Sequence, residues 1–228
     1  MAAPWWRAPK TPIGPWPWWT ATLEPDPTLS TPALVILAAG ASTRLGQHKA
    51  LVELRGEPAI AHLLRAGRAL GDSAPLVITG ADRGAISDTL EALDHAGLPE
   101  LVHNPNWSEG RGSGLLLAAS LRVGRDLCVA PVDCPLVCPQ VFEALARAWA
   151  EAGRPASGWL GPRLGTDPSA PHGHPMLLGR ELLSKWDGKE SLRDLRQRAL
   201  PLLSVAVEDR AILDNLDRPE DLDRLRAR

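Results

Sequence analysis

The feature that most constrains the fold of this chain is a repeated alternation of short apolar runs with longer amphipathic segments. Residues 33–39 (ALVILAA) form an uninterrupted apolar run that ends at Gly40. A run of this length without polar alternation is typical of a strand buried on both faces, as in a parallel sheet. Further strands are expected at residues 75–80, 100–103 and 126–132.

Helical segments separate these runs. Pro58 opens a stretch with a helical apolar stripe, and further helices are predicted over residues 85–96, 113–123 and 139–152. This alternation predicts an α/β fold, a doubly wound and mostly parallel sheet in a three-layer α/β/α arrangement. After Gly153 the pattern is less regular. Loops with room for one strand are expected over 154–175, followed by strands at 176–178 and 202–207, helices near 180–186 and 191–199, and a last helix from Pro219.

The composition divides the chain into two parts. Five of the 9 Trp and eight of the 22 Pro lie within residues 1–32. Because proline removes backbone donors and blocks helix, this part is predicted to be a disordered leader, or a stretch preceding the true start codon. The alternative is an arm that docks on a partner through its tryptophans. Residues 33–228 form the predicted catalytic domain, long enough for a core without disulfides.

Charge and cysteine content exclude several classes of protein. The chain has 25 basic and 27 acidic residues, a formal net charge of −2, so no broad basic field for nucleic acid or anionic lipid is expected. Three cysteines, an odd number without a C-x-x-C pair, favour a reducing cytoplasmic setting. No apolar stretch is long enough to predict a membrane span.

The segment with the clearest chemistry is residues 37–49 (LAAGASTRLGQHK), which follows the first strand. Gly40 and Gly46 are expected to adopt positive φ and to let backbone N–H groups approach phosphate oxygens. Arg44 and Lys49 supply two cations for a polyphosphate. Ligands in such sheets bind at the carboxyl ends of strands, where this loop lies. The alternative is an ordinary glycine turn.

This segment resembles the start of the MobA-like nucleotidyltransferases, roughly L-A-[AG]-G-x-S-x-R-[ML]-G-x-x-K. The resemblance extends over residues 33–228 and is strongest to the molybdenum cofactor cytidylyltransferases. It implies that Leu37, Ala38, Ala39 and Gly40, together with Arg44 and Lys49, bind a nucleoside triphosphate. Relatives with L-A-A-G tend to take CTP and those with L-A-G-G tend to take GTP, so Ala39 points to CTP.

Asp133 follows the fourth predicted strand in the sequence APVDCP. A carboxylate at the end of a strand, facing the segment of residues 37–49 (the phosphate loop), suits Mg²⁺. The resemblance implies that this D-x-P motif carries the metal ligand. The alternative is a helix cap, because Pro135 and Pro139 mark a helix entry. Cys134 is interpreted as a tolerated small residue rather than as a nucleophile.

The second expected metal ligand lies in the last block, residues 214–221 (DNLDRPED). It resembles the family's D-[IV]-[DN]-T-P-E-D-L block, which implies a metal contact by Asp217. Asn215 is the weaker candidate. The alternative role of this block is to cap the last helix, whose N-terminal dipole favours acidic residues.

Two further blocks are expected to form the base and acceptor sides of the site. Residues 104–113 resemble an N-P-x-W-x-x-G-x-x-x-S-L block, which implies that Gly112 and Ser113 bind the nucleotide, whereas Trp107 is expected in the core. A base-stacking platform is not expected. Residues 171–176 (PHGHPM) resemble a G-H-P block, which implies that His174 binds the acceptor. A structural role for His174, or a transition-metal site formed with His172, are the alternatives.

The function expected from these residues is Mg²⁺-dependent transfer of a nucleoside monophosphate, favoured as CMP, from an NTP to a phosphate-bearing acceptor. The resemblance makes molybdopterin the acceptor and a molybdenum enzyme a possible partner. Guanylyl transfer, or transfer to a sugar or polyol phosphate, is the alternative within the same chemistry. A non-catalytic nucleotide-binding partner of a molybdenum enzyme is the alternative of another class, against which Arg44, Lys49 and Asp133 argue.

Overall fold

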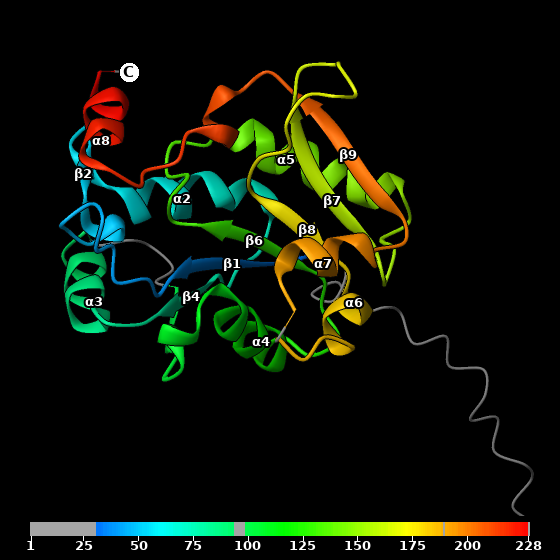
Figure 1. Ribbon diagram of the computed structural model, residues 1–228, viewed down its shortest axis with the longest axis horizontal. Coiled ribbons are helices and arrows are strands. Elements are labelled where there is room, and N and C mark those ends of the chain that lie inside the picture. The colour runs from blue at the N-terminus through cyan, green and yellow to red at the C-terminus, as the bar shows by residue number, and fades with distance from the viewer. Residues whose placement is uncertain (1–30, 94–98, 189, 228) are drawn as a thin grey trace, which may run out of the picture.

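A seven-stranded sheet forms the centre of the computed structural model, which describes residues 31–93, 99–188 and 190–227 (Figure 1). The strands in chain order are β1 (Ala33–Ala38), β4 (Leu76–Thr79), β5 (Glu100–His103), β6 (Leu127–Pro131), β7 (Trp159–Leu164), β8 (Met176–Leu178) and β9 (Leu202–Val207). Their spatial order is β5-β4-β1-β6-β8-β7-β9. β8 runs antiparallel to β6 and β7, and the other pairings are parallel. The predicted mostly parallel sheet is therefore confirmed.

Helices cover both faces of this sheet. They are α2 (Ala59–Gly67), α3 (Arg83–Ala92), α4 (Arg111–Leu121), α5 (Pro139–Glu151), α6 (Arg180–Ser184), α7 (Leu192–Gln197) and α8 (Pro219–Arg226). One hydrophobic cluster joins α2, α3 and α5 to the sheet, and a second joins α4, α6 and α7 to it. Figure 1 shows α2 and α5 on one side of the sheet and α4 and α6 on the other. The predicted three-layer arrangement is confirmed.

The first strand shows why a continuous apolar run is needed. Leu34 and Ile36 belong to one cluster, whereas Ala33 and Val35 belong to the other. Successive side chains of a strand point to opposite faces, so a strand covered on both sides must be apolar at every position. The same reasoning accounts for β4 and β6, all of whose residues are buried.

Residues 53–58 contain a small hairpin that the apolar pattern did not predict. β2 (Glu53–Leu54) and β3 (Glu57–Pro58) pair antiparallel. Arg55 and Gly56 between them both have positive φ, 53° and 81°, as a tight two-residue hairpin turn requires. Strands of two residues are too short to show an alternation, and Pro58 also precedes α2 as its N-cap.

A third hydrophobic cluster attaches the C-terminal helix to the start of the domain. It includes Leu45 of the phosphate loop, Leu54 of the hairpin, and Leu216, Leu222 and Leu225 around α8. Leu225 is fully buried. This cluster places the segment before α8 beside the phosphate loop, although the two lie far apart in the sequence.

All but the last two residues of the predicted leader, 1–32, lie outside the described residues, so the domain division stays a prediction. Within the described part of the chain, no helix has the length and apolar character needed to cross a bilayer. Cys128, Cys134 and Cys138 are free thiols.

Candidate active site

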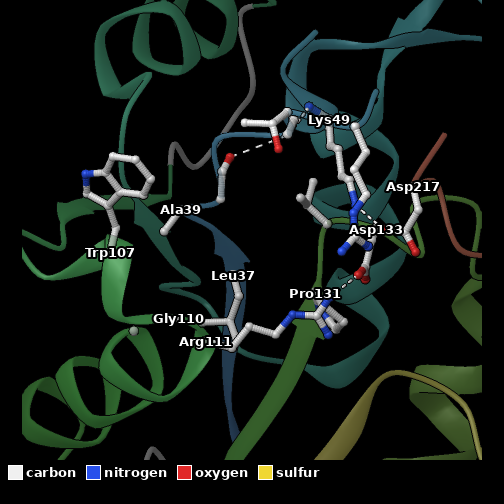
Figure 2. Close-up of a pocket in the computed structure, with 15 residues that line it drawn as sticks. Leu37, Ala39, Lys49, Trp107, Gly110, Arg111, Pro131, Asp133 and Asp217 are labelled. Atoms are coloured by element: carbon white, nitrogen blue, oxygen red, sulfur yellow. Dashed lines mark hydrogen bonds and ion pairs between the residues drawn. The ribbon is translucent and has the colours of Figure 1, made fainter. Parts of the chain in front are cut away.

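A pocket of about 330 Å³ opens at the carboxyl ends of β1 and β6. Its volume is in the range of small-molecule sites. The walls come from the phosphate loop, the turn before α4, the segment after β6 and the segment before α8 (Figure 2). The lining residues are Leu37, Ala39, Gly40, Ser42, Thr43, Arg44, Lys49, Trp107, Gly110, Arg111, Gly114, Pro131, Val132, Asp133 and Asp217.

The phosphate loop is held by its own serine. The Lys49 backbone N–H donates to Ser42 Oγ at 3.1 Å, and the Gly46 N–H donates to the Ser42 carbonyl at 3.2 Å. Gly46 has the predicted positive φ, 75°, but Gly40 does not, and Ser42 (φ 51°) takes the second left-handed position instead. Ser42 tolerates this conformation because its hydroxyl closes the loop onto Lys49.

The nucleotide-binding residues expected in β1 divide into two groups. Leu37, Ala39 and Gly40 line the pocket, whereas Ala38 is buried in the core on the other face of the strand. The period of two along the chain separates Leu37 and Ala39 from Ala38, and Gly40 lies in the loop beyond the end of β1.

The two predicted metal ligands come together in the pocket. The Leu216 N–H donates to the Asp133 carbonyl oxygen at 2.7 Å, which holds the segment of Asp217 against the end of β6. The Asp217 carboxylate accepts a hydrogen bond from the Lys49 ammonium, and the two groups form an ion pair. Both acidic residues and Lys49 therefore share one wall of the site (Figure 2).

The carboxylate of Asp133 has the environment expected of a cation ligand. The residue is 5% exposed. Its Oδ2 accepts a hydrogen bond from Arg111, and its Oδ1 is buried without a hydrogen-bond partner in the described part of the chain. A buried carboxylate oxygen left without a partner costs free energy, and a hard cation bound by oxygen ligands would satisfy it. Asp133, with the more exposed Asp217 beside it, thus fits a divalent metal ion. No group of three or more His, Cys, Asp or Glu in the described residues forms a ready-made metal cluster, so substrate oxygens and water would complete the coordination.

Cys134 and Asn215 pair with each other beside these acids. The Cys134 thiol donates to Asn215 Oδ1 at 3.0 Å. Burial raises the pKa of Cys134, and the neighbouring Asp133 carboxylate raises it further. The thiol is therefore protonated at neutral pH and is a poor nucleophile, which supports the interpretation of Cys134 as structural. The Asn215 side-chain oxygen is directed to this thiol, which favours Asp217 over Asn215 as a metal ligand.

In the turn before α4, one residue lines the pocket and others stabilise the backbone. Gly110, with φ 104°, turns the chain into the helix and lines the pocket. Ser113 is outside the pocket lining. Its Oγ accepts a hydrogen bond from Asn104 Nδ2 at 2.9 Å and lies 2.9 Å from the Gly110 carbonyl oxygen, so it stabilises the turn. Gly112 is also outside the lining, and its Cα packs on Gly188 and Trp186, where a Cβ would lie 3.1 Å from the Gly188 carbonyl oxygen.

Trp107 lies elsewhere than expected. The residue is partly exposed and lines the pocket near Ala39 (Figure 2), so the prediction that it belongs to the core is wrong. Periodicity could not reveal this, because Trp107 lies in a single 3-10 turn (Trp107–Glu109) where no helical or strand stripe exists.

His174 is not among the residues that line the pocket. Its backbone N–H donates to the Ile212 carbonyl oxygen at 2.9 Å, and the Nδ1 atom of its ring is buried without a partner among the described residues. Burial lowers the pKa of His174; Asp133 opposes this shift and Arg111 adds to it. The ring is therefore neutral at pH 7 and able to donate one hydrogen bond. Because Asp133 is close enough to influence His174, His174 stays a candidate for acceptor binding.

Arg111 is a site residue that the sequence pattern did not reveal. It is the first residue of α4, lines the pocket and forms an ion pair with Asp133. The only available signal was an arginine between two glycines, Gly110 and Gly112, directly before a predicted helix.

The fold is that of an α/β protein with a pocket at the carboxyl ends of its parallel strands. The model of the MobA-like NTP transferase domain matches residues 34–203 of this chain. The chain therefore belongs to the MobA-like NTP transferase family, and it is a nucleotidyltransferase. The matched region contains Arg44, Lys49 and Asp133 and ends before Asp217.

Individual proteins are also similar to this chain. The molybdenum cofactor guanylyltransferase of Pseudomonas paraeruginosa (strain DSM 24068 / PA7) is 32% identical over 208 residues, covering 86% of this chain and 95% of that protein. The bifunctional protein GlmU of Dinoroseobacter shibae is 33% identical over 122 residues, 51% of this chain, and the match spans 26% of that protein. The crystal structure of Rv0371c from Mycobacterium tuberculosis H37Rv superposes with a TM-score of 0.69 at 23% identity, covering 88% of this chain and 100% of that one. A structure of Rv0371c in complex with manganese has a TM-score of 0.66 at 22% identity, covering 86% and 98%. These two similarities support the fold.

Proposed function

We propose that this enzyme transfers a nucleoside monophosphate from an NTP to the phosphate group of molybdopterin, and that it uses Mg²⁺. The observation that carries the proposal is the convergence of Arg44, Lys49, Asp133 and Asp217 in one pocket. These residues come from three separate segments and combine cations for a triphosphate with two carboxylates for a metal ion. The similarity to a molybdenum cofactor guanylyltransferase over nearly its whole length supports the choice of acceptor.

The reaction needs one displacement. An anionic oxygen of the acceptor's phosphate attacks the α-phosphorus of the NTP, the bond between the α-phosphorus and its bridging oxygen to the β-phosphorus breaks, and pyrophosphate leaves. A phosphate monoester is already ionised near pH 7, so no general base is required. Arg44 and Lys49 hold the β- and γ-phosphates and stabilise the charge of the leaving pyrophosphate.

Asp133 and Asp217 would hold the metal ion, which supplies charge neutralisation at the phosphates when bound. Lys49 belongs to the phosphate loop and pairs with Asp217 in this structure. Its ammonium group is therefore close both to a candidate metal ligand and to the proposed binding site of the phosphates. We propose that Lys49 moves its hydrogen bond from Asp217 to a phosphate oxygen when the substrate complex forms.

The favoured nucleotide is CTP, because the loop carries Ala39 where relatives that take GTP tend to have glycine. The Ala39 methyl narrows the pocket beside Trp107, but one methyl contributes only ~1–3 kcal/mol of discrimination. Guanylyl transfer is the second candidate, and the guanylyltransferase relative favours it. We further propose that a molybdenum enzyme receives the product. We also propose a cytoplasmic location, where the three free cysteines would remain reduced.

The test is pyrophosphate release by the purified protein with Mg²⁺, molybdopterin and each of the four NTPs in turn. Release with CTP above that with GTP is expected. The reverse order would support guanylyl transfer, and no release with either nucleotide would refute the acceptor.

Asp133→Asn tests the metal assignment. Release is expected to fall by about a hundredfold or more, while NTP binding measured without metal is retained. Asp223→Asn, an exposed change on α8 outside the pocket, is the matched control and should leave the rate unchanged. Equal rates for wild type and Asp133→Asn would contradict the role of Asp133.

A further inference from the structure

Arg111 supplies a third cation to the pocket from the side opposite the phosphate loop. Gly110 turns the chain so that Arg111 begins α4 with its side chain directed across the pocket to Asp133 (Figure 2). The Arg111 side chain is 56% exposed, whereas that of Asp133 is 6% exposed. The guanidinium therefore reaches a nearly buried carboxylate while part of it still faces the pocket.

Each of the two candidate metal ligands is paired with one cation in this structure. Lys49 pairs with Asp217 and Arg111 pairs with Asp133. Once Asp133 engages a divalent cation, the guanidinium of Arg111 loses its counter-charge. A guanidinium has five N–H donors in a planar fork that matches phosphate oxygens, and only Nη2 is used in the contact with Asp133.

The position of Arg111 points to the acceptor rather than to the triphosphate. Arg44 and Lys49 already supply two cations from the loop after β1. Arg111 forms an ion pair with Asp133, which follows the end of β6. His174 precedes β8, the strand beside β6. Among the described residues that line the pocket, Arg111 is the one basic residue outside the phosphate loop.

We propose that Arg111 binds the phosphate group of the acceptor, and that Asp133 is its counter-ion until the substrates arrive. The proposal rests on the nucleotidyl transfer proposed above. It assigns a specificity role, because an acceptor without a phosphate would leave this guanidinium without an anion.

The kinetic test compares Arg111→Met with wild type in the presence of Mg²⁺, varying molybdopterin at saturating NTP and then NTP at saturating molybdopterin. The KM for molybdopterin is expected to rise at least tenfold, while the KM for the NTP changes less than twofold. Arg111→Lys keeps the charge but loses the fork, so an intermediate KM is expected. Arg147→Met, on the exposed face of α5, removes the same charge outside the pocket and should behave as wild type. An unchanged KM for molybdopterin, or an equal rise in both KM values, would overturn the assignment.

A binding measurement separates this proposal from the identity of the acceptor. Inorganic phosphate is titrated calorimetrically into the protein loaded with Mg²⁺ and the α,β-methylene analogue of CTP or GTP, whichever nucleotide binds. Wild type and Arg147→Met should bind phosphate, and Arg111→Met should bind it at least tenfold more weakly. If this difference is found while molybdopterin is not a substrate, the proposed acceptor is wrong and the role of Arg111 stands. If Arg111→Met binds phosphate as wild type does, or wild type binds none, the role of Arg111 is refuted.

Discussion

Removal of the Arg111 side chain should strengthen divalent metal binding in the absence of nucleotide. In the free protein the guanidinium occupies Oδ2 of Asp133, so a metal ion must compete with it for this carboxylate. Two unit charges at a typical ion-pair separation of ~4 Å attract by ~4 kcal/mol at an effective dielectric constant of ~20. Because the Arg111 side chain is 56% exposed, water screens the pair, and exposed pairs contribute only ~0–1 kcal/mol.

The pair combines one nearly buried and one half-exposed partner, so a value between these limits, ~1–2 kcal/mol, is appropriate. Since 1.4 kcal/mol corresponds to a tenfold change in affinity, the Arg111→Met protein should bind Mn²⁺ about 5- to 30-fold more tightly than wild type. The measurement is a Mn²⁺ titration followed by electron paramagnetic resonance, with unbound Mn²⁺ as the signal.

Two controls define the result. Arg147→Met measures the effect of losing one positive charge far from the pocket, and Asp133→Asn should abolish tight binding in either background. Unchanged or weaker Mn²⁺ binding by Arg111→Met would refute the competition between guanidinium and metal, and with it the assignment of Asp133 as the shared anion.

The remaining predictions concern the phosphate loop, the C-terminal helix and pH. A Cβ at Gly80 would lie 2.1 Å from the Ala39 carbonyl oxygen, whereas a Cβ at Gly84 would meet nothing within 4 Å. Gly80→Ala should therefore displace the loop and raise the NTP Kd about tenfold in calorimetry, and Gly84→Ala should not; equal Kd values would contradict the close approach. Leu225→Ala removes a fully buried side chain of the third cluster and should lower the free energy of unfolding by ~2–5 kcal/mol in a urea titration, a loss below ~1 kcal/mol being inconsistent with this packing. Burial lowers the pKa of His48 in the folded state, so the unfolded chain takes up more protons as the pH falls through about 6.5, and stability falls with it. The free energy of unfolding of His48→Gln should depend less on pH than that of wild type between about pH 7 and 5.5, and identical slopes would exclude this contribution.

Local sequence predicted several elements of the fold with their bounds. The strands at 100–103 and 202–207 have the predicted bounds, and the last helix begins at Pro219 as expected. The hairpin at 53–58 was missed because two-residue strands show no alternation. Helix α4 begins at Arg111 rather than at residue 113, because the positive φ of Gly110 turns the chain earlier than the apolar stripe begins.

The predicted site was most complete where one short segment carries several functional groups. Arg44 and Lys49 could be predicted because the spacing of glycines and basic residues in their loop is a recognisable pattern. Asp133 could be predicted because it follows the end of a predicted strand. All three line the pocket. Trp107 was misplaced because it lies in a short turn, and Arg111 was missed because it directly follows that turn as the first residue of α4. At both positions the side-chain direction depends on the surrounding packing and not on a periodic pattern.

The sequence alone thus determined the layers of the fold and the phosphate loop, because buried strands and close-approach loops restrict residue types locally. The pairing of charges was decided by the tertiary structure. Asp217 meets Lys49, 168 positions away in the chain, because the cluster around Leu225 attaches α8 to the phosphate loop. Arg111 meets Asp133 because the ends of α4 and β6 converge on one pocket. Such contacts depend on how the core packs, and no local pattern encodes them.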